Sequence, residues 1–287
     1  MIRFAQVSDQ DAVIALWKRC FPGDDDFRDW FFAQVYDPAV TLLDEEQGEL
    51  CAMVQMLPYQ LRDARGVRPV TYIYGACTAP EYRRQHRMDR LLQHSFELDR
   101  QKGSVASILI PQEEWLFGFY DQFGYQTAFY LDTAVMHRED VPVSDGIRRM
   151  TAADIPAMRE LYEAAPGVRL LRSDTDWKRQ LELFDRLGAG VYGLEADGSL
   201  KSYAFVWQDG AEQLWAQECC GANTHMLAQG IMRDCACQRI RMTSSKPVHK
   251  LGCIRYHDDT PVEPGYFNLL FNWGGNCYGI CFPCRRL

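Results

Sequence analysis

The sequence predicts an α/β protein, α+β in arrangement, with two tandem domains that each form a mixed, mostly antiparallel sheet flanked by helices. Two observations lead to this class. The chain has 287 residues, more than one hydrophobic core usually requires. The same order of elements also occurs twice: a strand, a helix, three strands, a helix and a strand. We expect one domain over residues 1–138 and the second over 147–287, joined by a polar linker.

The repeat is clearest where each half begins. Both openings are typical of a short strand, an aspartate near a helix start, and an amphipathic helix. The residues Ile2, Arg3, Asp9, Ala12 and Leu16 recur as Ile147, Arg148, Asp154, Ala157 and Leu161. Chance could produce one such window, but the elements that follow repeat as well.

Those later elements keep a nearly constant offset. A hairpin around a Gln-Gly turn at 41–57 corresponds to one around an Asp-Gly turn at 191–207. A third strand is expected at 70–78 and at 212–220, followed in each half by a helix and another strand. A duplicated domain therefore explains the sequence better than chance does.

Composition limits the classes of function. The net charge of −8 and the pI of about 5.3 argue against a general nucleic-acid binder, which needs a basic face. No apolar run is long enough for a transmembrane helix, and the first residues do not resemble a signal peptide. The eleven cysteines are then expected to be reduced thiols of a cytoplasmic protein.

The most informative stretch lies at 72–100. A β-rich run ends at Thr78, Pro80 breaks the strand, and a basic loop leads directly into an amphipathic helix. The start of a helix presents unpaired N–H groups and the positive end of the helix dipole. With three arginines beside it, this loop is predicted to bind an anion such as a pyrophosphate. The alternative is a solvated basic helix start.

This strand, loop and helix resemble the acetyl-CoA motif of the GNAT acetyltransferases, whose loop pattern is Arg/Gln-x-x-Gly-x-Gly/Ala. Arg83 matches the first position, whereas His86 and Met88 stand where the family has small residues. The resemblance implies acetyl-CoA as co-substrate. It assigns coenzyme binding to the strand end and to the loop with the helix start: Ala76, Cys77 and Thr78, and then Arg83, Arg84, Gln85, His86, Arg87 and Met88.

A second segment, at 108–126, resembles the GNAT helix that ends in Phe-Tyr-x-x-Phe-Gly-Phe/Tyr. The resemblance implies that Tyr120 is the general acid that protonates the departing thiolate. Its alternative role is a core aromatic. Glu113 and Glu114 are candidate general bases, although two adjacent acids more often complement the dipole at a helix N-terminus. Cys77 is interpreted as a packing residue.

The whole pattern resembles the tandem-GNAT proteins related to the enhanced-intracellular-survival aminoglycoside acetyltransferases. The second half lacks the basic loop, so we expect a degenerate copy without coenzyme that completes the substrate cleft or forms a homo-oligomer interface. The tail carries Cys277, Cys281 and Cys284, a spacing compatible with a metal site, but ordinary thiols are favoured and no metal is predicted.

The function expected from the resemblance is transfer of an acetyl group from acetyl-CoA to an amine of a small molecule or peptide. Neither a nucleic acid nor a membrane is expected as a partner. The alternative is a non-catalytic protein that binds acyl-CoA or another small molecule on the same scaffold. Turnover of acetyl-CoA would separate the two.

Overall fold

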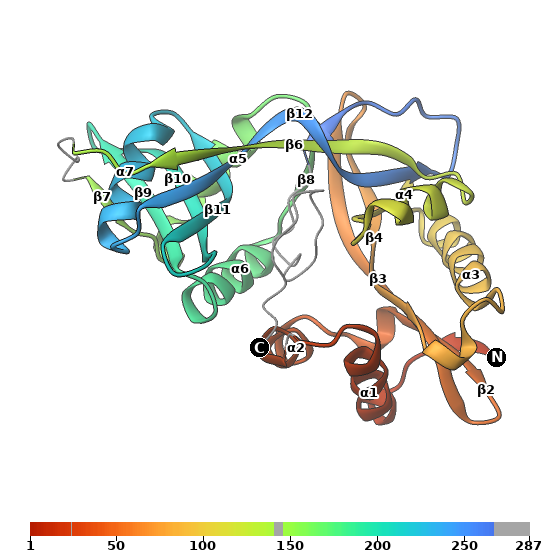
Figure 1. Cartoon of the computed structure of the whole chain (residues 1–287). Helices are drawn as coiled ribbons and strands as arrows, with labels where there is room; N and C mark the ends of the chain where they lie inside the picture. The colour runs from red at the N-terminus through yellow and green to blue at the C-terminus, as the bar shows by residue number, and fades with distance from the viewer. Residues whose placement is uncertain (24, 141–145, 267–287) are drawn as a thin grey trace. The chain divides into compact units, whose positions relative to one another are not determined.

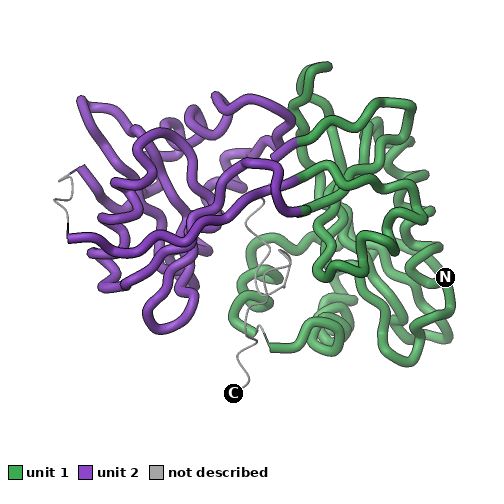
Figure 2. Tube along the Cα trace, turned by 45° about the horizontal axis from the view of Figure 1, so that its top comes forward, with its two compact units in different colours: residues 1–129, 250–264, 272–287 green, residues 130–249, 265–271 purple. Residues whose placement is uncertain are grey.

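The computed structural model describes residues 1–23, 25–140 and 146–266. They fall into two compact units (Figure 2). Among the described residues, unit 1 contains those of 1–129 and 250–264, and unit 2 those of 130–249 and 265–266. Each unit is a mixed α/β structure, as the sequence predicts.

Unit 1 contains most of the elements expected for the first half (Figure 1). Its elements are β1 (Ile2–Phe4), α1 (Gln10–Cys20), α2 (Asp25–Gln34), β2 (Thr41–Glu46), β3 (Glu49–Asp63), β4 (Gly66–Thr78), α3 (Arg87–Lys102), β5 (Ala106–Leu109), α4 (Glu114–Asp121) and the start of β6 (Gln126–His137). Strands β1 to β4 pair antiparallel in chain order, and β5 is parallel to β4.

Helices cover both faces of this sheet, because successive side chains of a strand point to opposite faces. On one face, Val54 and Ile73 pack in a core with Leu91 and Phe96 of α3. On the other face, the ring of Tyr74 lies 5.0 Å from that of Phe31 in α2, and 5.9 Å from that of Trp17 in α1. β3 and β4 therefore lie between α3 on one face and α1 and α2 on the other.

Unit 2 repeats the pattern. Its elements are β7 (Ile147–Arg149), α5 (Ile155–Ala164), β8 (Val168–Leu171), α6 (Asp174–Arg186), β9 (Gly190–Ala196), β10 (Ser199–Gln208), β11 (Gln213–Gly221), α7 (Thr224–Asp234), much of β12 (Arg239–Tyr256) and β13 (Gly265–Tyr266). β7, β9, β10 and β11 pair antiparallel in that order, and β12 runs parallel to β11.

The duplication extends to individual contacts. In unit 1, Arg3 binds both carboxylate oxygens of Asp9, at 2.6 and 2.9 Å. In unit 2, Arg148 binds those of Asp154 at 3.0 and 2.6 Å. Each arginine also pairs with a glutamate of the hairpin strand beside it. The repeated Arg and Asp of the sequence therefore fasten the helix entry to the sheet in both halves.

The boundaries of the two units differ from the predicted domain limits, residues 138 and 147, because two long strands each contribute residues to both units. The first residues of β6 lie in unit 1 and the rest in unit 2. The last residues of β12 lie in unit 1, where they pair antiparallel with β5 from Cys253 opposite Leu109 to Tyr256 opposite Ala106. A strand supplied from the far end of the chain thus completes the sheet of unit 1.

Side-chain contacts hold this late strand in unit 1. Cys253 is buried in the same hydrophobic core as α3. Arg255 donates from Nε to the carbonyl of Phe123 at 2.8 Å. His257, just beyond the strand, lies 3.2 Å from the buried carboxylate of Asp99 on α3. Among the described helices, none has the length and apolar character needed to cross a bilayer.

We predict that unit 1 depends on this late strand. Replacing Ile254, which is 2% exposed, with Asp removes a buried side chain worth about 1.5–3 kcal/mol and adds a buried charge. Urea unfolding should show a loss of at least about 3 kcal/mol. Val248→Asp is the matched control, since Val248 lies in the same strand and is 59% exposed. Equal losses for the two variants would contradict the assignment.

Candidate functional site

A bulge in β4 marks the centre of the candidate site. Met53 of β3 lies opposite Cys77, but Gln55 lies opposite Tyr74, so Gly75 and Ala76 together face the single residue Val54. Gly75 has φ +56°, and a Cβ atom there would lie 2.7 Å from the ring of Trp17. Glycine is required both by the backbone conformation and by the close approach of α1.

Beyond the bulge, β4 and β5 separate. Their parallel pairing runs from Val70 opposite Ala106 to Tyr72 opposite Ile108, whereas β4 continues to Thr78 paired with β3 alone. Ala79 donates its N–H to the carbonyl of Cys51 on β3. The N–H of the preceding residue, Thr78, therefore points to the opposite side, where β5 has ended. An extended chain could pair with this open edge of β4.

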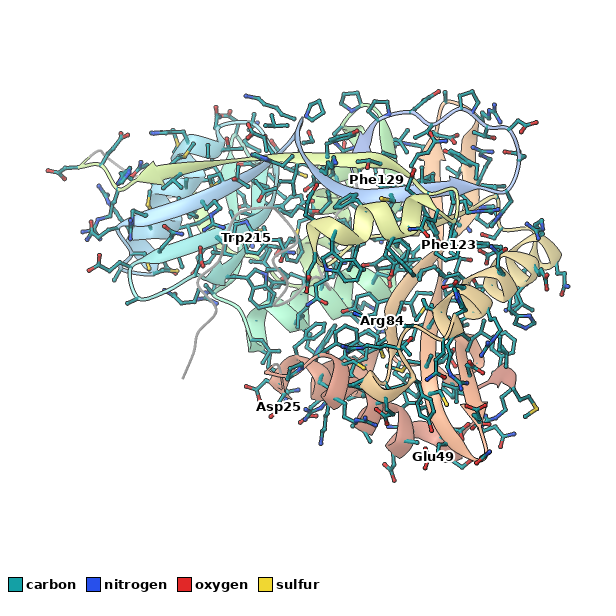
Figure 3. All side chains as sticks on the ribbon, turned by 45° about the vertical axis from the view of Figure 1, so that its right-hand side comes forward. Asp25, Glu49, Arg84, Phe123, Phe129 and Trp215 are labelled. Carbon is teal, nitrogen blue, oxygen red and sulfur yellow. The ribbon has the colours of Figure 1, made fainter. Side chains whose placement is uncertain are left out.

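The basic loop follows directly. Arg83, Arg84, Gln85 and His86 are all exposed before α3 begins at Arg87 (Arg84 is labelled in Figure 3). Arg84 and His86 both have left-handed backbones, with φ of 60° and 56°, whereas Gln85 between them does not. Alternation of this kind turns backbone N–H groups toward one side and forms an anion-binding concavity. Arg83 also donates from Nε to the carbonyl of Thr78 at 3.3 Å. The loop therefore combines exposed cationic side chains with a helix N-terminus.

His86 shows how a residue other than glycine can occupy this position. Its backbone adopts the left-handed conformation that glycine would favour, and its imidazole is 84% exposed. Nδ1 lies 2.6 Å from the carboxylate of Asp89 in the first turn of α3. The side chain thus points out of the loop and leaves the backbone shape intact.

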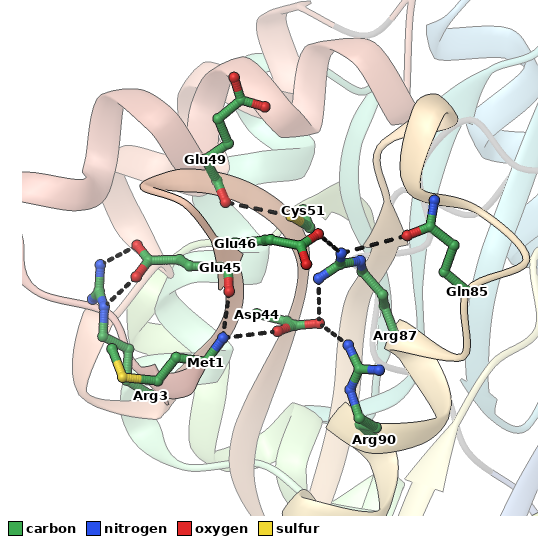
Figure 4. Close-up of polar contacts among 10 residues, drawn as sticks. All are labelled: Met1, Arg3, Asp44, Glu45, Glu46, Glu49, Cys51, Gln85, Arg87 and Arg90. Atoms are coloured by element: carbon green, nitrogen blue, oxygen red, sulfur yellow. Dashed lines mark hydrogen bonds and ion pairs between the residues drawn. The ribbon is translucent and has the colours of Figure 1, made fainter.

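Arg87 is placed differently from the other arginines. Its side chain is 6% exposed and forms ion pairs with Asp44, at 3.3 Å, and with Glu46 (Figure 4). Asp44 also accepts a bond from Arg90 at 2.9 Å. These contacts fix the first turn of α3 to β2, so only the backbone of Arg87 remains available to a ligand. No sequence signal distinguishes this arginine from Arg83 and Arg84.

Tyr120 lies in α4 and faces the core that also contains Ala76 and Met88. Its ring is 8% exposed and packs edge-on against Tyr125, with centroids 5.6 Å apart. Within the described part of the chain, its hydroxyl has no hydrogen-bonding partner. Burial raises the pKa of Tyr120 above its ordinary value of 10, so the phenol keeps its proton at neutral pH. Tyr120 is thus part of the hydrophobic core against which Ala76 and Met88 pack.

Glu114 is the first residue of α4 and is not buried with them. Its carboxylate is 71% exposed and lies 3.4 Å from the ammonium group of Lys250. This is the arrangement expected of an acid at a helix N-terminus. Its role as general base stays a prediction without a supporting contact. In α2, the rings of Trp30 and Phe31 are fully buried and belong to the hydrophobic core.

Cys20, the last residue of α1, contacts β4 in a way that no motif or spacing in the sequence indicates. Its thiol donates to the carbonyl oxygen of Thr78, which lies 3.5 Å from the sulfur. Arg83 donates from Nε to the same carbonyl. Cys77, the residue before Thr78, is buried. Cys20 and Thr78 are far apart in the chain, and only the packing of α1 on β4 brings them together.

The corresponding strand and helix of unit 2 carry different chemistry. β11 is bulged near Glu218, whose carboxylate is fully buried and bonded to Arg172 at 2.8 Å and to Tyr203 at 2.8 Å. Two residues alone, Ala222 and Asn223, connect β11 to α7. Asn223 keeps the left-handed conformation seen at His86, but the connection carries no basic side chain. The absence of coenzyme there stays a prediction.

Comparison with family models identifies the type of domain in the first half of the chain. Residues 1–128 match the family model of the acetyltransferase (GNAT) domain. Comparison with curated proteins finds no significant match. Together with the fold, the domain match supports an acyltransferase. Cys277, Cys281 and Cys284 lie outside the described residues, and within those residues no three potential metal ligands cluster.

Solved structures resemble both halves of the chain. A probable N-acyltransferase from Enterococcus faecalis has a TM-score of 0.71 at 14% identity, covering 89% of this chain and 72% of that one. Eis1 from Mycobacterium abscessus has a TM-score of 0.64 at 15% identity, covering 90% and 74%. Yeast N-myristoyltransferase with bound myristoyl-CoA has a TM-score of 0.59 at 9% identity, covering 92% and 84%. These likenesses show a GNAT-like fold.

We predict that the left-handed backbone at His86 governs which residues the loop accepts. His86→Gly should unfold at an equal or higher temperature than the natural protein, because glycine adopts this conformation without strain. His86→Val should be less stable by about 1–2 kcal/mol, since a β-branched residue is disfavoured at positive φ. Thermal unfolding of both variants measures the difference. A valine variant as stable as the glycine variant would show that the loop does not have this shape.

Proposed function

We propose that the chain is an acetyl-CoA-dependent N-acetyltransferase that passes the acetyl group directly to an amine of a small molecule or peptide. The observation that carries this proposal is the open edge of β4 beyond Tyr72, which leads through the short 3₁₀ helix Pro80–Tyr82 into the exposed basic loop at the start of α3. An extended arm joined to a pyrophosphate matches an edge followed by an anion site. Coenzyme A has that form, because its pyrophosphate links the pantetheine arm to the adenosine.

The residues present fit such a group. The exposed guanidinium groups of Arg83 and Arg84, with the N–H groups at the start of α3, would hold the pyrophosphate. The N–H of Thr78, which points to the open edge of β4, and by the same alternation that of Ala76, would pair with the amide groups of the arm and donate to the thioester oxygen as negative charge develops on it, with Cys77 between them. Gln85, His86, Arg87 and Met88 would contribute through the backbone of the loop and of the helix start.

Proton transfer is assigned to Tyr120. A thiolate that leaves during acyl transfer needs a proton, and a phenol can supply it. Tyr120 suits the role because its hydroxyl has no partner among the described residues and because its raised pKa keeps it protonated. The acceptor amine must also lose a proton, and Glu114 is retained as a candidate base on sequence grounds.

A non-catalytic acyl-CoA-binding protein is the second candidate. It is favoured by the placement of Glu114, which is exposed and paired with Lys250 instead of facing the core that holds Tyr120. Incubation with acetyl-CoA and a panel of primary amines separates the two functions. Release of free coenzyme A that requires an amine supports the enzyme, and binding without any release supports the second candidate.

Coenzyme binding should depend on Arg83 and Arg84. Replacing either with Ala removes a charge-assisted contact worth about 1.5–3 kcal/mol, which is at least a tenfold loss of affinity. Calorimetric titration with acetyl-CoA measures the change. Arg100→Ala is the matched control, because Arg100 is exposed in the last turn of the same helix. Unchanged affinity in the Arg83 and Arg84 double variant would refute the placement of the pyrophosphate.

Tyr120→Phe should lower kcat by about 10²–10⁴-fold while coenzyme affinity changes little, since the ring and its packing remain. Because the tyrosine pKa is raised, its ionisation should cause no loss of activity below pH 10. Tyr125→Phe is the control: its hydroxyl bonds to Ser107 at 2.6 Å, so stability should fall and turnover should persist. Wild-type turnover in a folded Tyr120→Phe variant would make Tyr120 a core aromatic alone.

A further inference from the structure

A buried glutamine lies beside the bulge of β4 and has no role in the fold that its contacts explain. Gln55 of β3 is 0% exposed. Within the part of the chain that the structure describes, neither its amide nitrogen nor its amide oxygen has a hydrogen-bond partner. An amide offers two donors and an acceptor, and leaving them unpaired away from water costs free energy. Such a group in a native core calls for a reason other than stability.

The Gln55 amide is aimed at the bulge. A Cβ atom at Gly75 would lie 3.1 Å from Nε2 of Gln55, so the amide lies directly against the glycine backbone. Gly75 is partly exposed, as is Tyr74, the residue opposite Gln55 in the sheet. The surface of the protein therefore reaches the backbone beside this amide. Because no hydrogen bond to the described residues holds the amide in place, it can turn about its side-chain torsions toward a ligand at the bulge.

Gln55 lies on the face of the sheet that α1 and α2 cover. Its neighbour Val54 belongs to the core with α3, and successive side chains of a strand point to opposite faces. Tyr120, whose proposed role is to protonate the leaving sulfur, faces that same core with α3. The departing group and its acid are thus assigned to one face of the bulge. The other face, where Gln55 lies, is left for the molecule that attacks the thioester.

We propose that Gln55 positions the acceptor amine, an inference that rests on the proposed acetyl transfer. Its Oε1 accepts one N–H of the neutral amine at the bulge, which leaves the lone pair of the nitrogen directed at the thioester carbon. The partly exposed ring of Tyr74, packed 5.9 Å from that of Trp17, favours an amine carried on an apolar or aromatic stem. Gln55 neither gives nor takes a proton, so a general base is still required.

Gln55→Met separates this role from a structural one. Methionine has a similar size and removes the unpaired amide, so the variant should unfold at an equal or higher temperature than the natural protein. The KM for the amine that reacts fastest should rise at least about tenfold, because one hydrogen bond is lost. The calorimetric affinity for acetyl-CoA should stay within about twofold, since Gln55 lies on the other face.

Gln60→Met is the matched control, because Gln60 lies in the same strand and is exposed. This variant should leave both the unfolding temperature and the KM for the amine unchanged. A lower unfolding temperature in Gln55→Met would show that the amide has a structural partner, and would overturn the inference. Turnover by the natural protein with an unaltered KM in Gln55→Met would refute the inference alone. Absence of turnover in the natural protein would refute the proposed function, and the inference with it.

A second variant tests which atom of the amide meets the amine. Gln55→Glu keeps an accepting oxygen and loses the donors, and its buried carboxyl should lower the unfolding temperature. The KM for the amine should nevertheless stay within about threefold of the natural value, because the acceptor remains. This opposite pattern, with binding kept and stability lost, supports the assignment to Oε1. A KM that rises as far as in Gln55→Met would overturn it.

Discussion

The separation of β4 from β5 after Tyr72 is the constraint on which the rest of unit 1 depends. Two parallel strands that stayed paired to their ends would leave no backbone donor for an extended ligand. The bulge at Gly75 and Ala76 lies where the strands part, and the close approach of Trp17 requires glycine there. Aromatic packing between α1 and β4 therefore constrains the same stretch of strand whose polar edge is left open.

The arginines near the start of α3 fall into two groups, those paired with acids and those left exposed. Asp44 and Glu46 of β2 bind Arg87 and thereby fasten the start of α3 to the sheet. Arg83 and Arg84, a few residues earlier, remain exposed on the loop. An acidic protein can thus present a local cationic site, because Asp44 and Glu46 pair with Arg87, whereas Arg83 and Arg84 form no ion pair within the described residues.

The sequence predicts the elements and the duplication well, because hydrophobic periodicity, turn residues and the repeated Arg3 and Asp9 are local signals. The domain limits were less accessible. The pairing of Cys253 with Leu109 joins distant segments, and nothing local in β12 shows which sheet its last residues complete. The same reason hid the burial of Arg87 and the contact between Cys20 and the carbonyl of Thr78. Which side chains of the site are buried or paired depends on tertiary packing. The strand, the loop and the helix that carry these side chains are indicated by the local sequence alone.

The late strand also bears on how the chain is made. Synthesis proceeds from the N-terminus, and β5 obtains its antiparallel partner only after roughly 140 further residues have been added. At the usual pace of translation, β5 waits roughly ten to thirty seconds with an unpaired edge. During that interval the nascent chain holds an incomplete first sheet while the second is being assembled. Such an unpaired edge is a site where a chaperone can bind. It is also a site where nascent chains on neighbouring ribosomes of one message can associate prematurely.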